Sequence, residues 1–177
     1  MRWLVIAILV LAGVGTVFAN IGGATYKGLE GQVSYAITPM IAVFANGSIN
    51  SAKATDTGLQ IAYAPKSTAA GGVIVKEGPL KFSAIDKYTG PQSATGDGNH
   101  AYDIKGYNSA VLAASYEVGP VRIGVEVSNV LDSQRVTQIG PNSKTLASAV
   151  GLPLATNFDQ YYYQAPRSIT GDVTFRF

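Results

Sequence analysis

Alternation of apolar and polar positions is the dominant pattern along the chain, and it is clearest in residues 168–177. There every odd position is apolar or glycine and every even position is polar or charged. Because successive side chains of a β-strand point to opposite faces, this stretch predicts a strand with one apolar and one polar face. The strand ends on the aromatic Phe177, the last residue of the sequence.

The same two-residue period recurs upstream and predicts six more strands. They are expected at residues 28–37, 40–53, 66–76, 80–88, 105–118 and 121–131. Tight turns with Pro39, Pro79 and Pro120 alternate with longer polar connections, of which residues 89–103 and 134–166 show no apolar period. The sequence therefore predicts an all-β, antiparallel up-and-down meander of about seven long strands, with short turns at one end and long loops at the other.

The alternation does not by itself decide which face meets water, because a soluble sandwich and a membrane barrel share it. Strands of ten or more residues, short turns at one rim and long loops at the other favour a transmembrane barrel. Tyrosines near the strand ends are typical of interfacial aromatic girdles. A sandwich core could not bury the charged face unpaired. The residues expected to face a barrel lumen are Glu30, Gln32, Arg122, Glu126, Asp172 and Arg176.

Residues 1–19 form a separate apolar leader. Arg2 precedes an apolar run at residues 4–14, and small residues end the segment before Asn20, as in a secretory signal peptide. An uncleaved transmembrane helix over residues 3–19 is the alternative. A strand is not expected here, since a segment apolar on both faces could not line a wet lumen. Seven strands are an odd number, so a curved open sheet or an incompletely closed barrel is expected over residues 20–177.

The composition argues against several classes of function. Thirteen Lys and Arg against eleven Asp and Glu give a net charge of +2 without a basic block, which argues against nucleic acid as a partner. The chain has no Cys and a single His, His100. The sequence shows no combination of a nucleophile, a general base and a residue that orients the base, as a catalytic triad would require. We therefore expect neither an enzyme nor a cofactor. The stretch 97–100 lacks the carboxylate spacing of a calcium loop, and residues 161–163 are expected in a girdle or in loop packing.

Four short motifs carry a resemblance to a known family. They are Tyr-Lys-Gly-Leu-Glu at 26–30, Ala-Pro-Lys-Ser at 64–67, Val-Ser-Asn-Val-Leu-Asp at 127–132 and Ala-Pro-Arg-Ser at 165–168. Residues 20–177 resemble the C-terminal barrel portion of TonB-dependent outer-membrane receptors. The most specific part joins the penultimate and last strands and consists of Asn129, Leu131, Asp132, Pro166 and Arg167.

The resemblance implies a bacterial outer-membrane location, with lipid and the outer-membrane assembly machinery as partners. It also implies that Val173, Phe175 and Phe177 form an assembly signal at the end of the barrel. Full-length family members take up ferric siderophores or similar nutrients and are powered through TonB. This sequence shows no plug domain, no TonB box and about a third of the strands of a 22-stranded barrel. It is therefore expected to be a remnant that is not competent for transport alone.

Two other functions stay open. A self-contained small outer-membrane barrel with a structural or adhesion role would use the same strands. A secreted soluble β-protein that binds a ligand would share the leader and the alternation.

Overall fold

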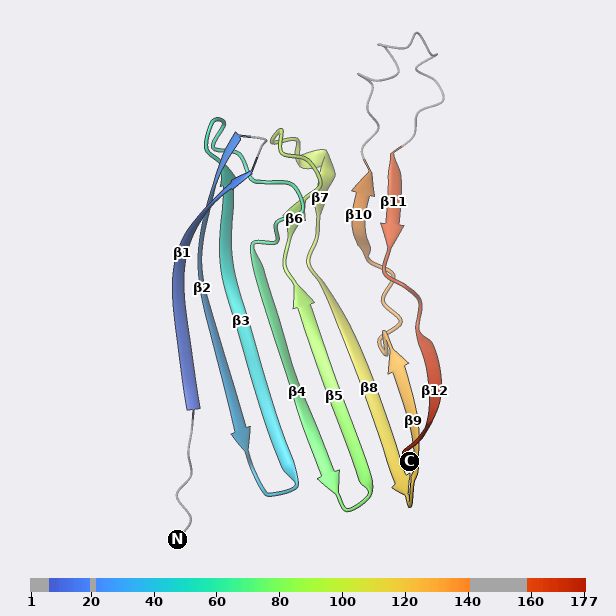
Figure 1. The fold of residues 1–177 in the computed structure, drawn as a ribbon. Coiled ribbons are helices and arrows are strands. Elements are labelled where there is room, and N and C mark those ends of the chain that lie inside the picture. Colours follow the sequence, from blue (N-terminus) through green and yellow to red (C-terminus); the bar gives the residue numbers. More distant parts are fainter. Residues whose placement is uncertain (1–6, 20–21, 141–158) are drawn as a thin grey trace.

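The computed structural model describes residues 7–19, 22–140 and 159–177, and its main element is one open antiparallel sheet (Figure 1). Each strand pairs with its neighbour in chain order and runs antiparallel to it. The antiparallel meander expected from the sequence is confirmed. The strands are β1 (Ala7–Ala19), β2 (Gly22–Ala36), β3 (Ile41–Ala54), β4 (Ser67–Glu77), β5 (Leu80–Thr89), β8 (Tyr107–Val118), β9 (Val121–Ser128) and β12 (Ser168–Phe175).

Three tight turns join β2 to β3, β4 to β5 and β8 to β9, and we name this edge of the sheet the short-turn rim. Gly78 and Gly119 adopt positive φ angles of 54° and 56° directly before Pro79 and Pro120. Glycine has no Cβ, so it enters this left-handed region without steric cost. In the first turn the Thr38 hydroxyl accepts hydrogen bonds from the backbone N–H groups of Met40 and Ile41. The opposite edge is the long-loop rim.

The sheet has eight strands, one more than the sequence predicted, because Ala7–Ala19 forms β1. The expectation that the leader adds no strand is therefore wrong for these residues. Backbone pairing explains the difference, since β1 hydrogen-bonds along β2 from Ala7 opposite Ser34 to Ala19 opposite Gly22, and such pairing does not depend on side-chain polarity. The proposed cleavage of the leader before Asn20 stays a prediction, and Asn20 itself lies outside the described residues.

The expected strand 121–131 is shorter than predicted, and the long connections contain short elements of their own. β9 ends at Ser128 because Asn129 turns the chain with a φ of 48°. The expected loop 89–103 holds β6 (Gln92–Ser93), a single 3₁₀ turn (His100–Tyr102) and the start of β7 (Asp103–Ile104). The segment 134–166 holds a hairpin of β10 (Val136–Gly140) and β11 (Gln160–Tyr163), and its residues 141–158 lie outside the described residues.

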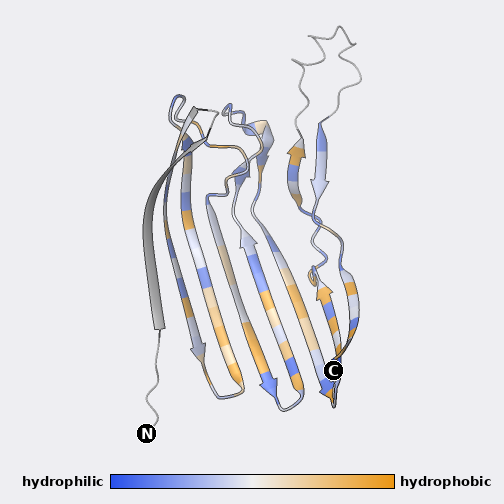
Figure 2. Ribbon diagram, in the orientation of Figure 1, coloured by the Kyte–Doolittle hydropathy of each residue, from blue (hydrophilic) through white to orange (hydrophobic). Residues whose placement is uncertain are grey.

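One face of the sheet, the apolar face, carries an uninterrupted cross-strand row of apolar residues. Following the registers from β2 to β12, this row consists of Tyr35, Val43, Val73, Ala84, Leu112, Val127 and Ile169. In Figure 2 apolar positions alternate with polar ones along the strands, as a two-residue period requires. Asp86 and Asn108 interrupt this face toward the long-loop rim, where the Asn108 amide donates to the Asp86 carboxylate at 2.5 Å.

The polar face holds the side chains of opposite parity. Its registered neighbours include Gln32 and Asn46, Glu30 and Ser48, and Ser48 and Thr68. A few apolar residues share it, because Phe44 and Ile85 lie over Gly72, where an added Cβ would come within 2.9 Å and 3.1 Å of their side chains. Among residues 7–19, 22–140 and 159–177, no second layer covers either face of the sheet (Figure 1).

Burial is concentrated at the long-loop rim rather than on the sheet. Ala94, Ile104 and Ile139 form a small buried cluster, against which Tyr102 and Val136 pack. Within the described part of the eight-stranded sheet, Ala52 is the one apolar residue that is fully buried. Folding therefore removes little apolar sheet surface from water, and the apolar face is left to meet another apolar medium or partner.

No α-helix occurs in the described residues, and so no helix in that part of the chain could cross a membrane. The sheet is also open, because β1 and β12 are its two outer strands and do not pair with each other. Of the two forms expected from the sequence, an open sheet and an incompletely closed barrel, the open sheet is confirmed.

Candidate functional site

The first candidate site is the corner where β9 ends and the chain later returns as β12. The Asn129 side chain is 4% exposed and its amide donates to the carbonyl oxygens of Ser133, at 3.0 Å, and Ala165, at 2.7 Å. Its own carbonyl oxygen accepts from the Ser133 N–H at 3.1 Å. A single side chain thus closes the turn after β9 and holds it against the segment that enters β12.

Asp132 makes the second connection at this corner. Its carboxylate accepts from the backbone N–H of Arg167 at 3.1 Å and lies 4.0 Å from the Arg167 guanidinium. Asp132 has a φ of 49° and its N–H donates to the Asn129 carbonyl at 2.8 Å. Asn and Asp tolerate this left-handed region better than most residues. The two motifs that are distant in sequence, 129–132 and 165–167, therefore meet and fix the return of the chain.

Leu131 and Pro166 belong to the same motifs but take no part in these hydrogen bonds. Leu131 is 64% exposed and Pro166 is exposed beside the corner. A role for these two residues stays a prediction.

A second group of side chains forms ion pairs on the polar face near the short-turn rim. Glu117 of β8 lies 3.1 Å from the Lys81 ammonium and 3.4 Å from the Arg176 guanidinium, and Arg122 lies 3.7 Å from Asp172. Three of these residues were expected to face a lumen, whereas Lys81 and Glu117 were missed. Strand parity could have placed both on the polar face, but the cross-strand position of Glu117 opposite Arg122 depends on the register. Cross-strand pairs of this kind stabilise the sheet modestly.

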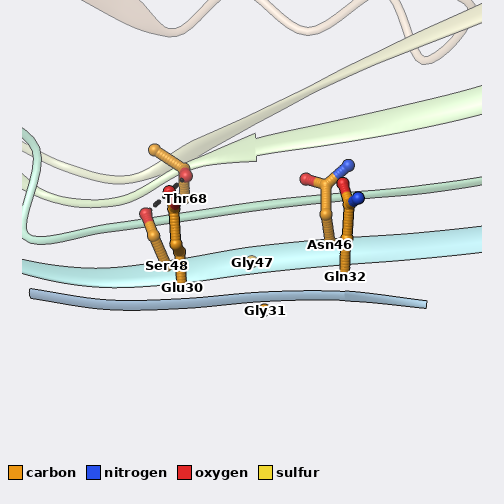
Figure 3. A pocket seen from close by; sticks show the side chains of 7 residues that line it. All are labelled: Glu30, Gly31, Gln32, Asn46, Gly47, Ser48 and Thr68. Atoms are coloured by element: carbon orange, nitrogen blue, oxygen red, sulfur yellow. Dashed lines mark hydrogen bonds between the residues drawn. The ribbon is translucent and has the colours of Figure 1, made fainter. Parts of the chain in front are cut away.

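The other expected lumen residues lie further toward the long-loop rim. The Glu126 carboxylate accepts from the Ser128 hydroxyl at 3.0 Å. Glu30 and Gln32 line a shallow hollow of about 230 Å³ on β2–β4 with Asn46, Ser48 and Thr68 (Figure 3). All six predicted residues share the polar face by strand parity, but the structure does not bring them into one site.

The hollow in Figure 3 is lined by polar side chains of β2, β3 and β4 around Gly31 and Gly47. The hydroxyls of Ser48 and Thr68 are 2.9 Å apart, and the Asn50 amide donates to Ser48 at 2.8 Å. Within the described residues the Glu30 side chain has no hydrogen bond or ion pair, although its backbone pairs in the sheet. Such a surface can hydrogen-bond water or a polar ligand, but it contains no group positioned for catalysis.

The long-loop rim forms a third region. The Tyr63 hydroxyl donates to the carbonyl of Ile139, and the Gln92 amide donates to the carbonyl of Thr137 at 3.4 Å, so loops from β3–β4 and β5–β8 are tied to the β10–β11 hairpin. The Tyr102 hydroxyl donates to Asp159 at 3.4 Å. Burial of the Tyr102 phenol and the nearby Asp159 carboxylate raise the pKa of Tyr102 above its usual range.

His100 and Asp103 form an ion pair on the surface of this rim. The His100 Nδ1 lies 2.8 Å from the Asp103 carboxylate, and this hydrogen bond lowers the pKa of Asp103 below its ordinary value. The carboxylate of Asp97 accepts from the Asn99 N–H at 3.0 Å. Across the described residues no group of three or more His, Cys, Asp or Glu side chains could hold a metal ion.

The proposed assembly residues lie on β12, one of the two outer strands, or directly after its end. Val173 and Phe175 are 59% and 60% exposed on the apolar face of β12, and Phe177 is also exposed. The residues 161–163 form part of β11 and are exposed at the long-loop rim.

No family model matches the chain, and no curated protein matches it. Solved structures do resemble it. They include the ferric yersiniabactin uptake receptor FyuA from Yersinia pestis, at 17% identity and a TM-score of 0.67, over 87% of this chain and 23% of that chain. The siderophore receptor PiuA from Acinetobacter baumannii has 18% identity and a TM-score of 0.62, over 94% of this chain and 24% of that chain.

The ferric citrate transporter FecA has 20% identity and a TM-score of 0.68, over 88% of this chain and 25% of that chain. These neighbours are TonB-dependent receptors. The chain has the fold of a segment of their barrel. It spans about a quarter of the length of each of these receptors. At this level of identity the likeness establishes the fold alone.

Proposed function

We propose that this chain is an exported segment of a bacterial outer-membrane β-barrel, related to the receptors whose fold it shares. The observation that carries the proposal is the uncovered apolar face, which spans the sheet strands β2, β3, β4, β5, β8, β9 and β12. In a barrel this face would meet lipid, and the opposite face, with its ion pairs and amides, would meet an aqueous interior. The outer-membrane location of the structural neighbours supports this assignment.

The height of the apolar face supports the same conclusion. On β8, apolar positions extend from Val118 to Ala110. At a rise of about 3.4 Å per residue these eight steps cover about 27 Å along the strand. With a strand tilt of about 40° the band would be about 21 Å tall, close to the apolar band of about 25 Å on outer-membrane barrels.

We further propose that residues 1–177 alone do not form a transporting pore. An open sheet in lipid leaves the outer backbone groups of β1 and β12 without partners, which costs several kcal/mol per group. A ferric siderophore or similar nutrient, and TonB, are proposed as partners only of a full-length relative. Lipid and the outer-membrane assembly machinery are the partners proposed for this chain.

The experiment that tests the membrane assignment is expression with fractionation. The protein should resist extraction by salt and alkali, dissolve only in detergent, and migrate differently on a gel before and after heating. Recovery of a folded, detergent-independent protein from the soluble fraction would refute the proposal and favour a secreted soluble β-protein.

A self-contained small barrel is the second candidate, and the strand count favours it. With β1 the sheet has eight strands, an even number. The outer strand β1 begins at the short-turn rim, and the outer strand β12 ends there. Bacterial single-chain barrels share this parity. Cleavage of the leader after Ala19 would leave seven strands. Mass spectrometry of the N-terminus of the exported protein therefore separates the two, since retention of β1 is required for the eight-stranded barrel.

A further inference from the structure

Two lysines lie on the apolar face, just beyond the end of its apolar part toward the long-loop rim. They are Lys27 of β2 and Lys53 of β3, and both are exposed. In the β2–β3 register Lys27 is opposite Ser51, and Thr25 is opposite Lys53. The two lysines are therefore diagonal neighbours on one face, close enough for both long side chains to reach a single group between them.

Neither ammonium group is neutralised by the protein. Within the described residues no ion pair or hydrogen bond involves the side chain of Lys27 or Lys53, although their backbones pair within the sheet. Asp56, the acidic residue nearest in sequence to Lys53, lies beyond the end of β3, and its carboxylate accepts from the Thr57 N–H at 2.9 Å. Glu30 has the opposite strand parity and lies on the polar face. The lysine pair thus presents two positive charges without a counter-ion.

The surface next to the pair toward the short-turn rim is apolar. Leu29 and Ile49 are opposite each other on the same face and are 55% and 70% exposed. Gly31 and Gly47 face each other at the next pair on this face, and the space beside Gly31 is open, with nothing within 4 Å of an added Cβ. A pair of positive charges on the protein next to an apolar surface is complementary to an amphiphile with an anionic head group and an apolar tail.

We propose that Lys27 and Lys53 bind the phosphate of an anionic membrane lipid, whose acyl chain packs on Leu29 and Ile49. This inference rests on the proposed membrane location, because only there does the apolar face meet lipid. Basic residues at such an interface attract anionic lipids with about 1 kcal/mol each, which corresponds to about a fivefold preference per lysine. Simple snorkelling of two lysines to the water interface, without lipid selectivity, is the competing explanation.

The test compares lipid selectivity in phosphatidylcholine vesicles with spin-labelled phosphatidic acid and spin-labelled phosphatidylcholine as probes. Electron spin resonance reports the fraction of each probe that is immobilised at the protein surface. The wild-type protein should prefer phosphatidic acid, each of Lys27→Ser and Lys53→Ser should lower that preference about fivefold, and the double variant should abolish it. Lys27→Arg should retain it.

Lys87 offers a matched control. It is exposed, its side chain has no hydrogen bond or ion pair within the described residues, and it lies on the polar face opposite Ala70. Lys87→Ser should leave the selectivity unchanged. Equal selectivity of the double variant and the wild-type protein, or an equal loss in Lys87→Ser, would overturn the lipid site. If neither probe is immobilised by the wild-type protein, the chain does not contact lipid, and the membrane assignment fails together with the site.

Discussion

At the residue scale, Asn129 joins more backbone segments than any other side chain of the corner between β9 and β12. Asn129→Ala would remove two donated hydrogen bonds and leave the carbonyls of Ser133 and Ala165 without this partner. It would also place Ala at a φ of 48°, where Asn is tolerated better. We expect a loss of about 2–3 kcal/mol in the free energy of unfolding, measured by urea titration of the refolded protein in detergent.

Asn50→Ala is the matched control for that change. Asn50 is exposed and donates one hydrogen bond, to the Ser48 hydroxyl. Its loss should cost less than about 1 kcal/mol. An equal effect of the two substitutions would show that the corner has no special role in stability.

The surface pair of His100 and Asp103 predicts a pH effect of defined sign. The His100 hydrogen bond lowers the pKa of Asp103, so the pair contributes to stability above the ordinary carboxylate range and loses this contribution as pH falls through the lowered pKa. His100→Ala should raise the pKa of Asp103 toward its ordinary value, measured by NMR titration of the carboxyl carbon. Both groups are well exposed, so little change in overall stability is expected. An unchanged Asp103 titration would contradict this assignment.

At the scale of the element, β12 separates the two faces most cleanly. Val173→Asp would put a charge on the exposed apolar face and should block membrane insertion, since a charge on the lipid face costs up to about 2–4 kcal/mol for Lys or Arg and less for Asp. Asp172→Asn lies on the polar face and removes one ion-pair partner of Arg122, so it should be tolerated. Heat-modifiable gel migration after expression measures insertion, and similar behaviour of both variants would show that the faces are assigned wrongly.

The elements show which parts of the fold are readable from sequence. β3, β4, β5 and β8 follow the predicted strands closely, because alternation and the turns at Pro39, Pro79 and Pro120 define both their faces and their ends. Such local signals do not encode pairing between distant segments. The strands β10 and β11 lie within a stretch without apolar period and pair with each other across residues 141–158. β1 was missed for another reason: it adjoins β2 in the sequence, but it lacks the alternation by which the other strands were predicted, and it pairs through its backbone.

The candidate sites divide in the same way. The corner motif was visible in the sequence as two separate stretches, but the hydrogen bonds between Asn129 and Ala165 and between Asp132 and Arg167 depend on how the chain returns after β9. Glu117 was missed as the centre of an ion-pair group, because its partners Lys81 and Arg176 lie on other strands. Cross-strand neighbours require the register, which alternation alone leaves undetermined.

At the scale of the whole molecule, the sheet has unpaired edges and almost no core. Its buried cluster lies at the long-loop rim, while the strands expose apolar residues on one face and polar residues on the other. This distribution is unsuited to an isolated sheet in water, and the two free edges are equally unsuited to lipid. Both features support the proposal that the chain is a segment of a larger barrel. The chain spans about a quarter of the length of the neighbouring receptors.

The open sheet gives the last prediction, which concerns conductance. Because β1 and β12 do not pair with each other, the sheet of the described residues encloses no lumen. The purified, refolded protein should therefore give no stable single-channel current in a planar bilayer. The leader decides the strand number, so the 20–177 chain should be recorded beside the full one. Seven strands cannot close with both ends at the short-turn rim, whereas eight strands have the parity of the smallest barrels.

A defined conductance from the full chain that is lost in the 20–177 chain would establish closure through β1 and favour the small-barrel alternative. A defined conductance from both would show that closure does not depend on β1 and would refute the barrel-segment proposal.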